Sequence, residues 1–317
     1  MAYTSGATSF DPDLTEIVEE AFERAGRELR SGYDLRTARR SLNIMFADWA
    51  NRGINMWTID TGMITLQQGV NTYALPNDTV DLLEHVIRTQ ANNAATQSDL
   101  TITRISVSTY ATIPNKITQA RPIQVWIQRM DGKVSSVNAA TTASMSATAT
   151  SVAITDVTQL PAAGFIQLDN EVISYGYIVQ NDNAISGTLN NCGRGQQNTI
   201  AVTHNSATAV YWTKPPAVTV WPTPDGSQTY QFVYWRLRRT QDSGGGVNVM
   251  DVPFRFYPCM IAGLAYYIAQ KIPEGTPRLD MLKASYDEAW QLAAYEDHEK
   301  AAVRFVPRQS FIASGSA

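Results

Sequence analysis

The beginning of the chain carries the hydrophobic spacing of two helices. The first has apolar residues at gaps of three and four, which places them on one helical face: Leu14, Ile17, Val18, Ala21, Phe22, Ala25 and Leu29. Asp11 is placed to cap this helix, and Pro12 suits its first position. The second helix follows the short link 31–33, which favours an antiparallel hairpin. Asp34 is expected to cap it and Gly53 to stop it, and its stripe is Leu35, Ala38, Leu42, Met45, Phe46 and Trp49.

The end of the chain shows the same kind of pattern. Pro253 is expected to open a helix that runs to about Lys271, and Thr276-Pro277 opens the last one. The last helix has the stripe Leu279, Leu282, Tyr286, Ala289, Trp290 and Ala293, whose gaps repeat those of the second helix. Two hairpins with complementary stripes predict a four-helix bundle that joins the two ends of the chain.

Between the helices the pattern changes to that of strands. Strands are predicted on both sides of the turn at 67–69 and at 82–88, 100–105 and 122–129. The last of these would continue into 217–222 and then 229–237 as an interrupted β-meander. The interruption, residues 134–212, is rich in Ala, Thr, Ser, Asn and Gly and has few charges. Its short apolar runs indicate an all-β module, which at about 80 residues is large enough to fold alone.

These patterns together predict an α+β fold with three parts. Residues 1–133 and 213–300 form a host domain, which consists of the four-helix bundle and the central β-meander. Residues 134–212 form an inserted small β-domain, and residues 301–317 form a C-terminal tail.

Composition and charge exclude several classes of protein. The chain has 317 residues and a net charge of −4, so bulk electrostatics do not favour nucleic-acid binding. Two cysteines cannot build a disulfide scaffold, and three histidines offer little for a metal site. No apolar run is long enough to cross a bilayer, and the first residues lack the pattern of a secretory signal. We expect neither a metal nor a cofactor.

Catalytic constellations are scarce. Cys192 and His204 could act as nucleophile and base, but Cys192 lies in a turn-like segment and no acid is evident to orient His204. His298 has acidic neighbours, which point in different directions on a helix. His85 and Glu84 face opposite ways in a predicted strand, which favours a structural histidine. We therefore predict that the chain is not an enzyme.

Two features suggest contacts with other proteins. Arginines cluster on the second helix and at the end of the meander, and either they balance acidic helix faces or they meet phosphates or a neighbouring subunit. We take them as candidates for a subunit interface: Arg36, Arg39, Arg40, Arg236, Arg238 and Arg239. The tail places apolar residues between basic ones, and it is either disordered or docks onto a partner by adding a strand or filling a groove. Its candidate residues are Arg304, Phe305, Val306 and Arg308.

The order of several motifs resembles the head-to-tail adaptor proteins of short-tailed bacteriophages. The motifs lie on both sides of residues 134–212: Phe46-Ala47-Asp48-Trp49-Ala50-Asn51-Arg52-Gly53, Gly69-Val70-Asn71-Thr72-Tyr73-Ala74-Leu75-Pro76, Ile113-Pro114-Asn115-Lys116, Arg121-Pro122 and Trp221-Pro222-Thr223-Pro224. The segments 165–175 and 192–195 look like small β-modules that recur in phage virion proteins, although compact adaptors lack such an insertion.

The resemblance implies a structural protein of the virion, made in the cytoplasm of the host bacterium. Such proteins assemble as a homo-oligomeric ring, usually of twelve copies, beneath the portal at the head-to-tail junction. The ring extends the channel for DNA ejection and carries the tail nozzle and often tail fibres. It implies no enzyme activity, and it gives the C-terminal tail a role in portal docking.

Two other functions stay open from the residues alone. The inserted β-domain could make the chain a tail-associated binding module or a fibre-attachment protein that recognises glycans or another surface protein. A cell-wall hydrolase would need paired carboxylates in a cleft, and the sequence offers no candidate pair.

Overall fold

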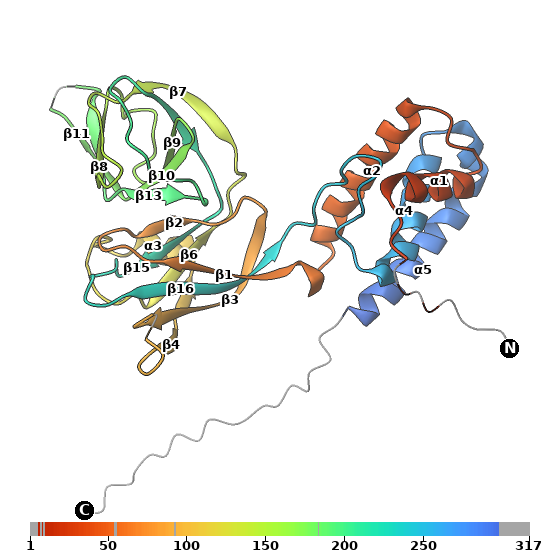
Figure 1. The fold of residues 1–317 in the computed structure, drawn as a ribbon, viewed down its shortest axis with the longest axis horizontal. Coiled ribbons are helices and arrows are strands. Elements are labelled where there is room, and N and C mark those ends of the chain that lie inside the picture. The colour runs from red at the N-terminus through yellow and green to blue at the C-terminus, as the bar shows by residue number, and fades with distance from the viewer. Residues whose placement is uncertain are drawn as a thin grey trace, which may run out of the picture. The chain divides into compact units, whose positions relative to one another are not determined.

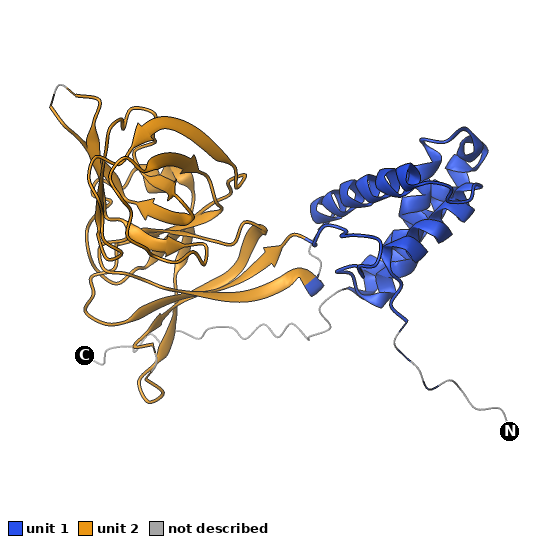
Figure 2. Ribbon diagram, turned by 45° about the horizontal axis from the view of Figure 1, so that its top comes forward, with its two compact units in different colours: residues 1–57, 240–317 blue, residues 58–239 orange. Residues whose placement is uncertain are grey.

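The chain divides into two compact units (Figures 1 and 2). The computed structural model describes residues 6, 8, 10–53, 56–91, 93–182 and 184–297. The first unit combines the two ends of the chain, Met1–Trp57 and Thr240–Ala317, and the second is Thr58–Arg239. The candidate docking residues of the tail, Arg304, Phe305, Val306 and Arg308, lie outside the described residues, as does His298.

The first unit is helical. It contains α1 (Leu14–Ala25), α2 (Gly32–Asn51), α4 (Tyr257–Ala269) and α5 (Leu279–Glu296), with 3-10 helices at Phe254–Phe256 and Pro273–Arg278. α1 is capped by Asp13 rather than by Asp11, because Asp13 and Glu16 each accept a hydrogen bond from the other's backbone N–H. α1 ends earlier than predicted because Gly26 takes a left-handed conformation with φ of 93°.

The predicted start of α2 is also shifted. Ser31 caps the helix by accepting a hydrogen bond from the backbone N–H of Asp34. The carboxylate of Asp34 is instead held by two hydrogen bonds from the Arg27 guanidinium, at 2.8 and 3.0 Å. Asp34 therefore fastens the end of α1 to α2 rather than capping α2.

The core of the first unit centres on Trp49 of α2. Its indole is fully buried and donates a hydrogen bond of 2.9 Å to the hydroxyl of Tyr286 on α5. The ring also packs against Phe256 and Trp290, with centroids 5.7 and 5.3 Å away. These contacts join segments from the two ends of the chain into one core.

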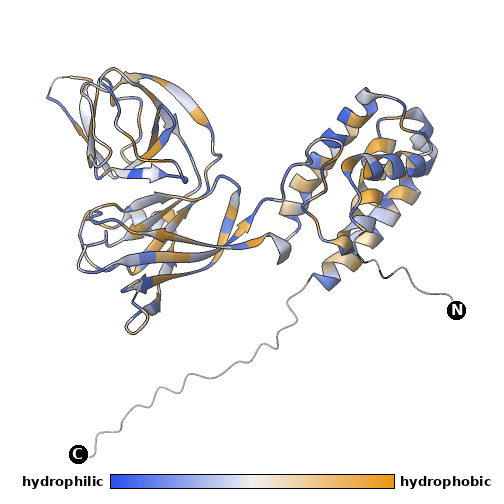
Figure 3. Cartoon of the chain, in the orientation of Figure 1, coloured by the Kyte–Doolittle hydropathy of each residue, from blue (hydrophilic) through white to orange (hydrophobic). Residues whose placement is uncertain are grey.

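The predicted four-helix bundle is wrong as a description of the fold. The chain is α+β overall, but among the described residues sixteen strands in four sheets predominate over five α-helices. The physical reason lies partly in α4. A bundle of two hairpins requires one apolar stripe on each helix, whereas α4 is buried on most sides and contacts α1, α2 and α5. Apolar residues recur along these helices and also along the strands of the second unit (Figure 3).

Two sheets of the second unit are built by the segments that flank residues 134–212. One has the order β1-β16-β3-β4, and the other has the order β2-β15-β6-β5. Their strands are β1 (Ile59–Thr65), β2 (Thr72–Ala74), β3 (Thr79–Thr89), β4 (Ser98–Thr101), β5 (Thr103–Ile105), β6 (Gln124–Gln128), β15 (Ala217–Trp221) and β16 (Tyr230–Arg238). A 3-10 helix at Met56–Thr58 precedes β1, and the short helix α3 (Val107–Ala111) follows β5.

The strands do not form one continuous meander. β6 pairs with β15 in antiparallel register, as the sequence predicts, but β16 leaves that sheet and pairs with β1 and β3. Residues of both sheets share one apolar core, which includes Tyr73, Val218 and Phe232. The two sheets therefore pack face to face instead of extending each other.

The remaining two sheets lie between β6 and β15 in the chain. One has the order β13-β10-β9-β14-β7, and the other has the order β11-β12-β8. Their strands are β7 (Val134–Ala140), β8 (Ser151–Ile154), β9 (Gly164–Leu168), β10 (Glu171–Tyr175), β11 (Tyr177–Gln180), β12 (Gly187–Asn190), β13 (Gly193–Gln196) and β14 (Ala209–Thr213). They enclose a core of their own, with Ile154, Ile166, Ile173 and Leu189 fully buried. We call residues 134–213 the β-module.

Candidate functional site

The histidine and cysteine that the sequence suggested as a catalytic pair serve separate purposes. Cys192 is buried, its thiol faces the carbonyl of Leu189 at 3.5 Å, and burial raises the pKa of the thiol to about 12. His204 contacts two carboxylates instead, at Asp169 and Glu171. A thiol with so high a pKa is not a nucleophile at neutral pH, so the pair has no catalytic arrangement.

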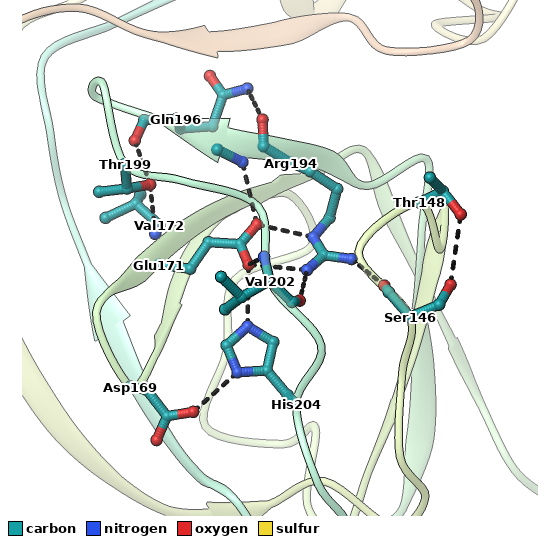
Figure 4. Close-up of polar contacts among 11 residues, drawn as sticks. Ser146, Thr148, Asp169, Glu171, Val172, Arg194, Gln196, Thr199, Val202 and His204 are labelled. Carbon is teal, nitrogen blue, oxygen red and sulfur yellow. Dashed lines mark hydrogen bonds and ion pairs between the residues drawn. The ribbon is translucent and has the colours of Figure 1, made fainter.

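Glu171 is the centre of a buried polar network in the β-module (Figure 4). It begins β10 immediately after the turn at Asp169, which takes a left-handed φ of 51°. The Arg194 guanidinium donates to both of its carboxylate oxygens, at 2.8 and 2.7 Å. The backbone N–H groups of Gly195 and Val202 donate to it at 3.0 and 3.1 Å. The Glu171 carboxylate therefore has hydrogen bonds from several directions and no exposed surface.

His204 completes the network. Its Nε2 lies 2.9 Å from Glu171 and its Nδ1 lies 2.8 Å from Asp169. Only the imidazolium form has two N–H donors and can donate to both carboxylates at once. The Arg194 guanidinium and the His204 ring thus face the carboxylates of Glu171 and Asp169.

The hydrogen bonds to Glu171 determine its ionisation. Burial by itself would raise the pKa of Glu171, but hydrogen bonds from Arg194, Val202, His204 and Gly195 outweigh it and lower the pKa to about 2. A carboxylate that is ionised and fully engaged cannot act as a general acid. The network therefore fastens residues 194–204 to the sheet, which is a structural task.

The segment that this network holds lines a cleft of about 650 Å³ in the second unit. Four strands contribute residues to the cleft: β1, β2, β13 and β16. The first three each lie at an edge of their own sheet. The side of β1 that does not pair with β16 is thus available for main-chain hydrogen bonds. An extended polar ligand would fit this arrangement better than a compact one.

Side-chain amides and an aromatic ring line the cleft. Gln197 donates from Nε2 to the carbonyl of Leu75 at 3.3 Å and to Asn77 at 2.6 Å. Gln196 accepts a hydrogen bond of 3.0 Å from the backbone N–H of Ala74. Tyr234 lies against Gly62 of β1, so closely that a Cβ at that glycine would be 2.4 Å from the phenol oxygen.

The cleft offers binding groups but no catalytic pair. Asp60 is the one carboxylate among the described residues that line it, and this side chain contacts Arg236 at 3.2 Å. Glycoside hydrolysis needs two carboxylates at a defined separation. What the cleft can do chemically is donate and accept hydrogen bonds along an elongated ligand.

The structure separates the arginines that the sequence grouped as interface candidates. Arg236 bridges Asp60 and Asp78, Arg238 also contacts Asp60 at 3.3 Å, and both side chains are largely buried. Arg239 is exposed at the end of β16 and binds the carbonyl of Asp78 through its backbone N–H. In the second unit these arginines hold β16 to its neighbours, and a role for them between subunits stays a prediction.

The other three candidates lie on α2 in the first unit. Arg36, Arg39 and Arg40 are all exposed. Arg39 reaches the carbonyl of Gly244 at 3.5 Å, and among the described residues no carboxylate forms an ion pair with any of the three. Their charge is thus presented to solvent.

His85 lies in β3 beside Phe232, with ring centroids 6.0 Å apart. Its two ring nitrogens are buried and have no hydrogen-bond partner among the residues that the structure describes. Burial lowers the pKa of His85. His85 is a structural histidine, as the alternation of the strand indicates. Its buried ring nitrogens, without partners among the described residues, reduce the stability of the fold.

Sequence reasoning missed Glu171 and the amides of the cleft. A usable signal was present, because Glu171 is a carboxylate at the start of an apolar strand and Arg194 lies between two glycines. A buried acid in such a place needs a cation. No comparable signal marks Gln196 and Gln197, because their partners lie about 120 positions away: backbone groups of Ala74 and Leu75 and the side chain of Asn77.

The described residues form neither a candidate metal site nor a membrane-spanning helix. Within the described part of the chain, no three His, Cys, Asp or Glu side chains are grouped to hold a metal ion. No described helix combines the length and apolarity needed to cross a membrane. The sequence matches no model of a known protein family and no curated protein.

Proposed function

We propose that the chain is a structural subunit of a head-to-tail adaptor ring in a short-tailed bacteriophage. In this role it joins the portal protein to the tail nozzle and extends the DNA channel at the head-to-tail junction of the virion. The proposal starts from the motif order on both sides of residues 134–212, including 46–53, 69–76 and 221–224.

One structural observation carries the proposal: the helical unit exposes large apolar side chains on two helices. Tyr33 and Ile44 of α2 are 68% and 52% exposed, and Met281 and Leu292 of α5 are 61% and 66% exposed. An exposed apolar face of a helix is a candidate interaction surface. A ring subunit needs two unlike faces of this kind, because each copy meets one neighbour on each side.

The polar groups of the second unit support a role without catalysis. Glu171 and His204 are bound to each other, the thiol of Cys192 is buried, and Asp60 is bound by arginines. A protein that lines a DNA channel should not bind phosphate tightly, because such contacts would hold the duplex in place. The net charge of −4 is compatible with this requirement.

Measurement of the assembled mass tests the proposal. The purified full-length chain is examined by analytical ultracentrifugation over a wide concentration range. A closed assembly of many copies is the expected result. A protein that stays monomeric at every concentration would refute a ring subunit that assembles by itself.

The cleft favours a second candidate function, in which the chain is a tail-associated binding module. Its volume of about 650 Å³ and its amide lining suit an elongated polar molecule such as a glycan. Titration with oligosaccharides, followed by NMR shifts of the side-chain amides, tests this function. Gln197→Ala should weaken binding, whereas Gln180→Ala in β11, away from the cleft, should not.

A further inference from the structure

The outer face of α2 carries a stripe that does not contribute to the core. Tyr33, Arg40 and Ile44 follow one another at spacings of seven and four residues, which places them on one side of the helix. All three are exposed. Arg36 and Arg39 lie beside the stripe, roughly 60° and 120° around the helix on the same side, from about 100° per residue.

The outer face of α5 carries a matching stripe of opposite charge. Met281, Glu288 and Leu292 are exposed and repeat the spacing of seven and four residues. Asp280 and Asp287 lie beside this stripe, roughly 100° and 120° around the helix in the same sense as the arginines of α2. Each stripe thus has apolar ends, a charged residue between them, and two like charges along one side.

We infer that the α2 stripe of one copy packs against the α5 stripe of the next copy, with the two helices antiparallel. This inference rests on the proposed ring and names the faces that build it. Residues on the same side of two facing helices meet only when the helices run in opposite directions, as in coiled coils. The antiparallel arrangement therefore places Arg36 and Arg39 opposite Asp287 and Glu288.

The apolar positions agree with the same register. Tyr33 and Ile44 are eleven residues apart, and so are Met281 and Leu292, so Ile44 lies beside Met281 while Tyr33 lies beside Leu292. Two α2 helices packed on each other would bring exposed arginines together, and two α5 helices would bring carboxylates together, which is unfavourable. A second copy that offers its other face resolves both problems, and such a heterologous contact can close into a ring.

Charge reversal tests the interface in the full-length chain. Arg36→Glu with Arg39→Glu should weaken self-association by on the order of 10- to 100-fold, because like charges would then face each other. Adding Asp287→Arg and Glu288→Arg to the same chain should restore the assembly. Arg121→Glu with Lys133→Glu is the matched control, because it changes the net charge equally at exposed cations of the second unit.

Cross-linking tests the register independently. One chain carries Ile44→Cys and another carries Met281→Cys, while Cys192 and Cys259 of both chains are buried. Mild oxidation of the mixture should give a disulfide-linked pair, which neither chain should form alone.

The outcomes distinguish a failure of the proposed ring from a failure of this interface. A wild-type chain that never associates overturns the ring and this interface together. A wild-type chain that associates while the reversed chain associates equally well overturns the interface alone. So does a folded variant with all four substitutions that fails to recover the assembly, or a disulfide-linked pair formed by either cysteine variant alone.

Discussion

Glu171→Gln is expected to destabilise the second unit strongly. The substitution keeps the shape of the side chain but removes the negative charge that faces Arg194 and His204. The side chain of Arg194 is only 7% exposed and that of His204 is fully buried, so water cannot replace the lost charge. The buried Arg194 guanidinium would then lie without the carboxylate that compensates its charge, and His204 would lose one of its two acceptors.

The size of the effect follows from the burial of the partners. Breaking a buried ion pair by removing one partner costs about 3–5 kcal/mol. For a unit of about 180 residues, each kcal/mol lowers the transition temperature by about 2–4 °C, so the transition should fall by roughly 6 to 20 °C. Asp169→Asn is the control. It alters the other carboxylate beside His204, but the Asp169 side chain is 63% exposed, so the loss should stay below about 1 kcal/mol.

Calorimetry of the full-length chain provides the assay, because the helical unit acts as an internal reference that neither substitution touches. The pH dependence gives a second readout. Because the folded pKa of Glu171 is lowered to about 2 from an ordinary 4.5, its contribution is complete above about pH 4.5 and disappears as the pH falls towards 2. Glu171→Gln should remove this acid-sensitive component. Equal transition temperatures for Glu171→Gln and Asp169→Asn would refute the reasoning.

Three further predictions address the second unit. Because burial lowers the pKa of His85, the stability of the wild-type protein should fall as the pH drops below about 6.5. His85→Phe should abolish this loss in acid denaturation curves and raise the free energy of unfolding by about 1 kcal/mol or more. An unchanged pH profile would contradict this prediction. Gly62→Ala should lower the free energy of unfolding in urea by about 1–3 kcal/mol, because the new methyl group would meet Tyr234. Gly32→Ala is the control, which should be neutral or stabilising because the space around Gly32 is open. Replacing residues 134–212 by a short linker should leave the rest of the chain folded, with a cooperative calorimetric transition, and an insoluble product would show that the boundaries are wrong.

Local patterns predicted the elements better than their arrangement. The gaps of three and four gave the helices of both chain ends, and antiparallel pairing of β6 with β15 follows the sequence prediction. The four-helix bundle was wrong because helical spacing records which face is buried but not which element covers it. For α4, burial on most sides is visible only once α1, α2 and α5 are placed.

The roles of the arginines show the same limit. Arg36 and Arg236 look alike in sequence, since each belongs to a short basic cluster. Arg236 is bound by Asp60 and Asp78, which lie more than 150 positions earlier in the chain, whereas Arg36 faces solvent. Sheet pairing between β1, β16 and β3 brings those aspartates to Arg236, and no local pattern reports such pairing.

The β-module is inserted between β6 and β15. Lys214 donates its backbone N–H to the carbonyl of Lys133 at 3.1 Å, and Gly132 donates to the carbonyl of Lys214 at 2.8 Å, so the module begins and ends at one place. It stands where a hairpin turn between β6 and β15 would otherwise be. The hydrogen bond from Ala74 to Gln196 then fixes the module against β2 and creates the cleft. The second function that we propose, ligand binding in the cleft, therefore requires the module, whereas the α2 and α5 stripes of the proposed interface belong to the other unit.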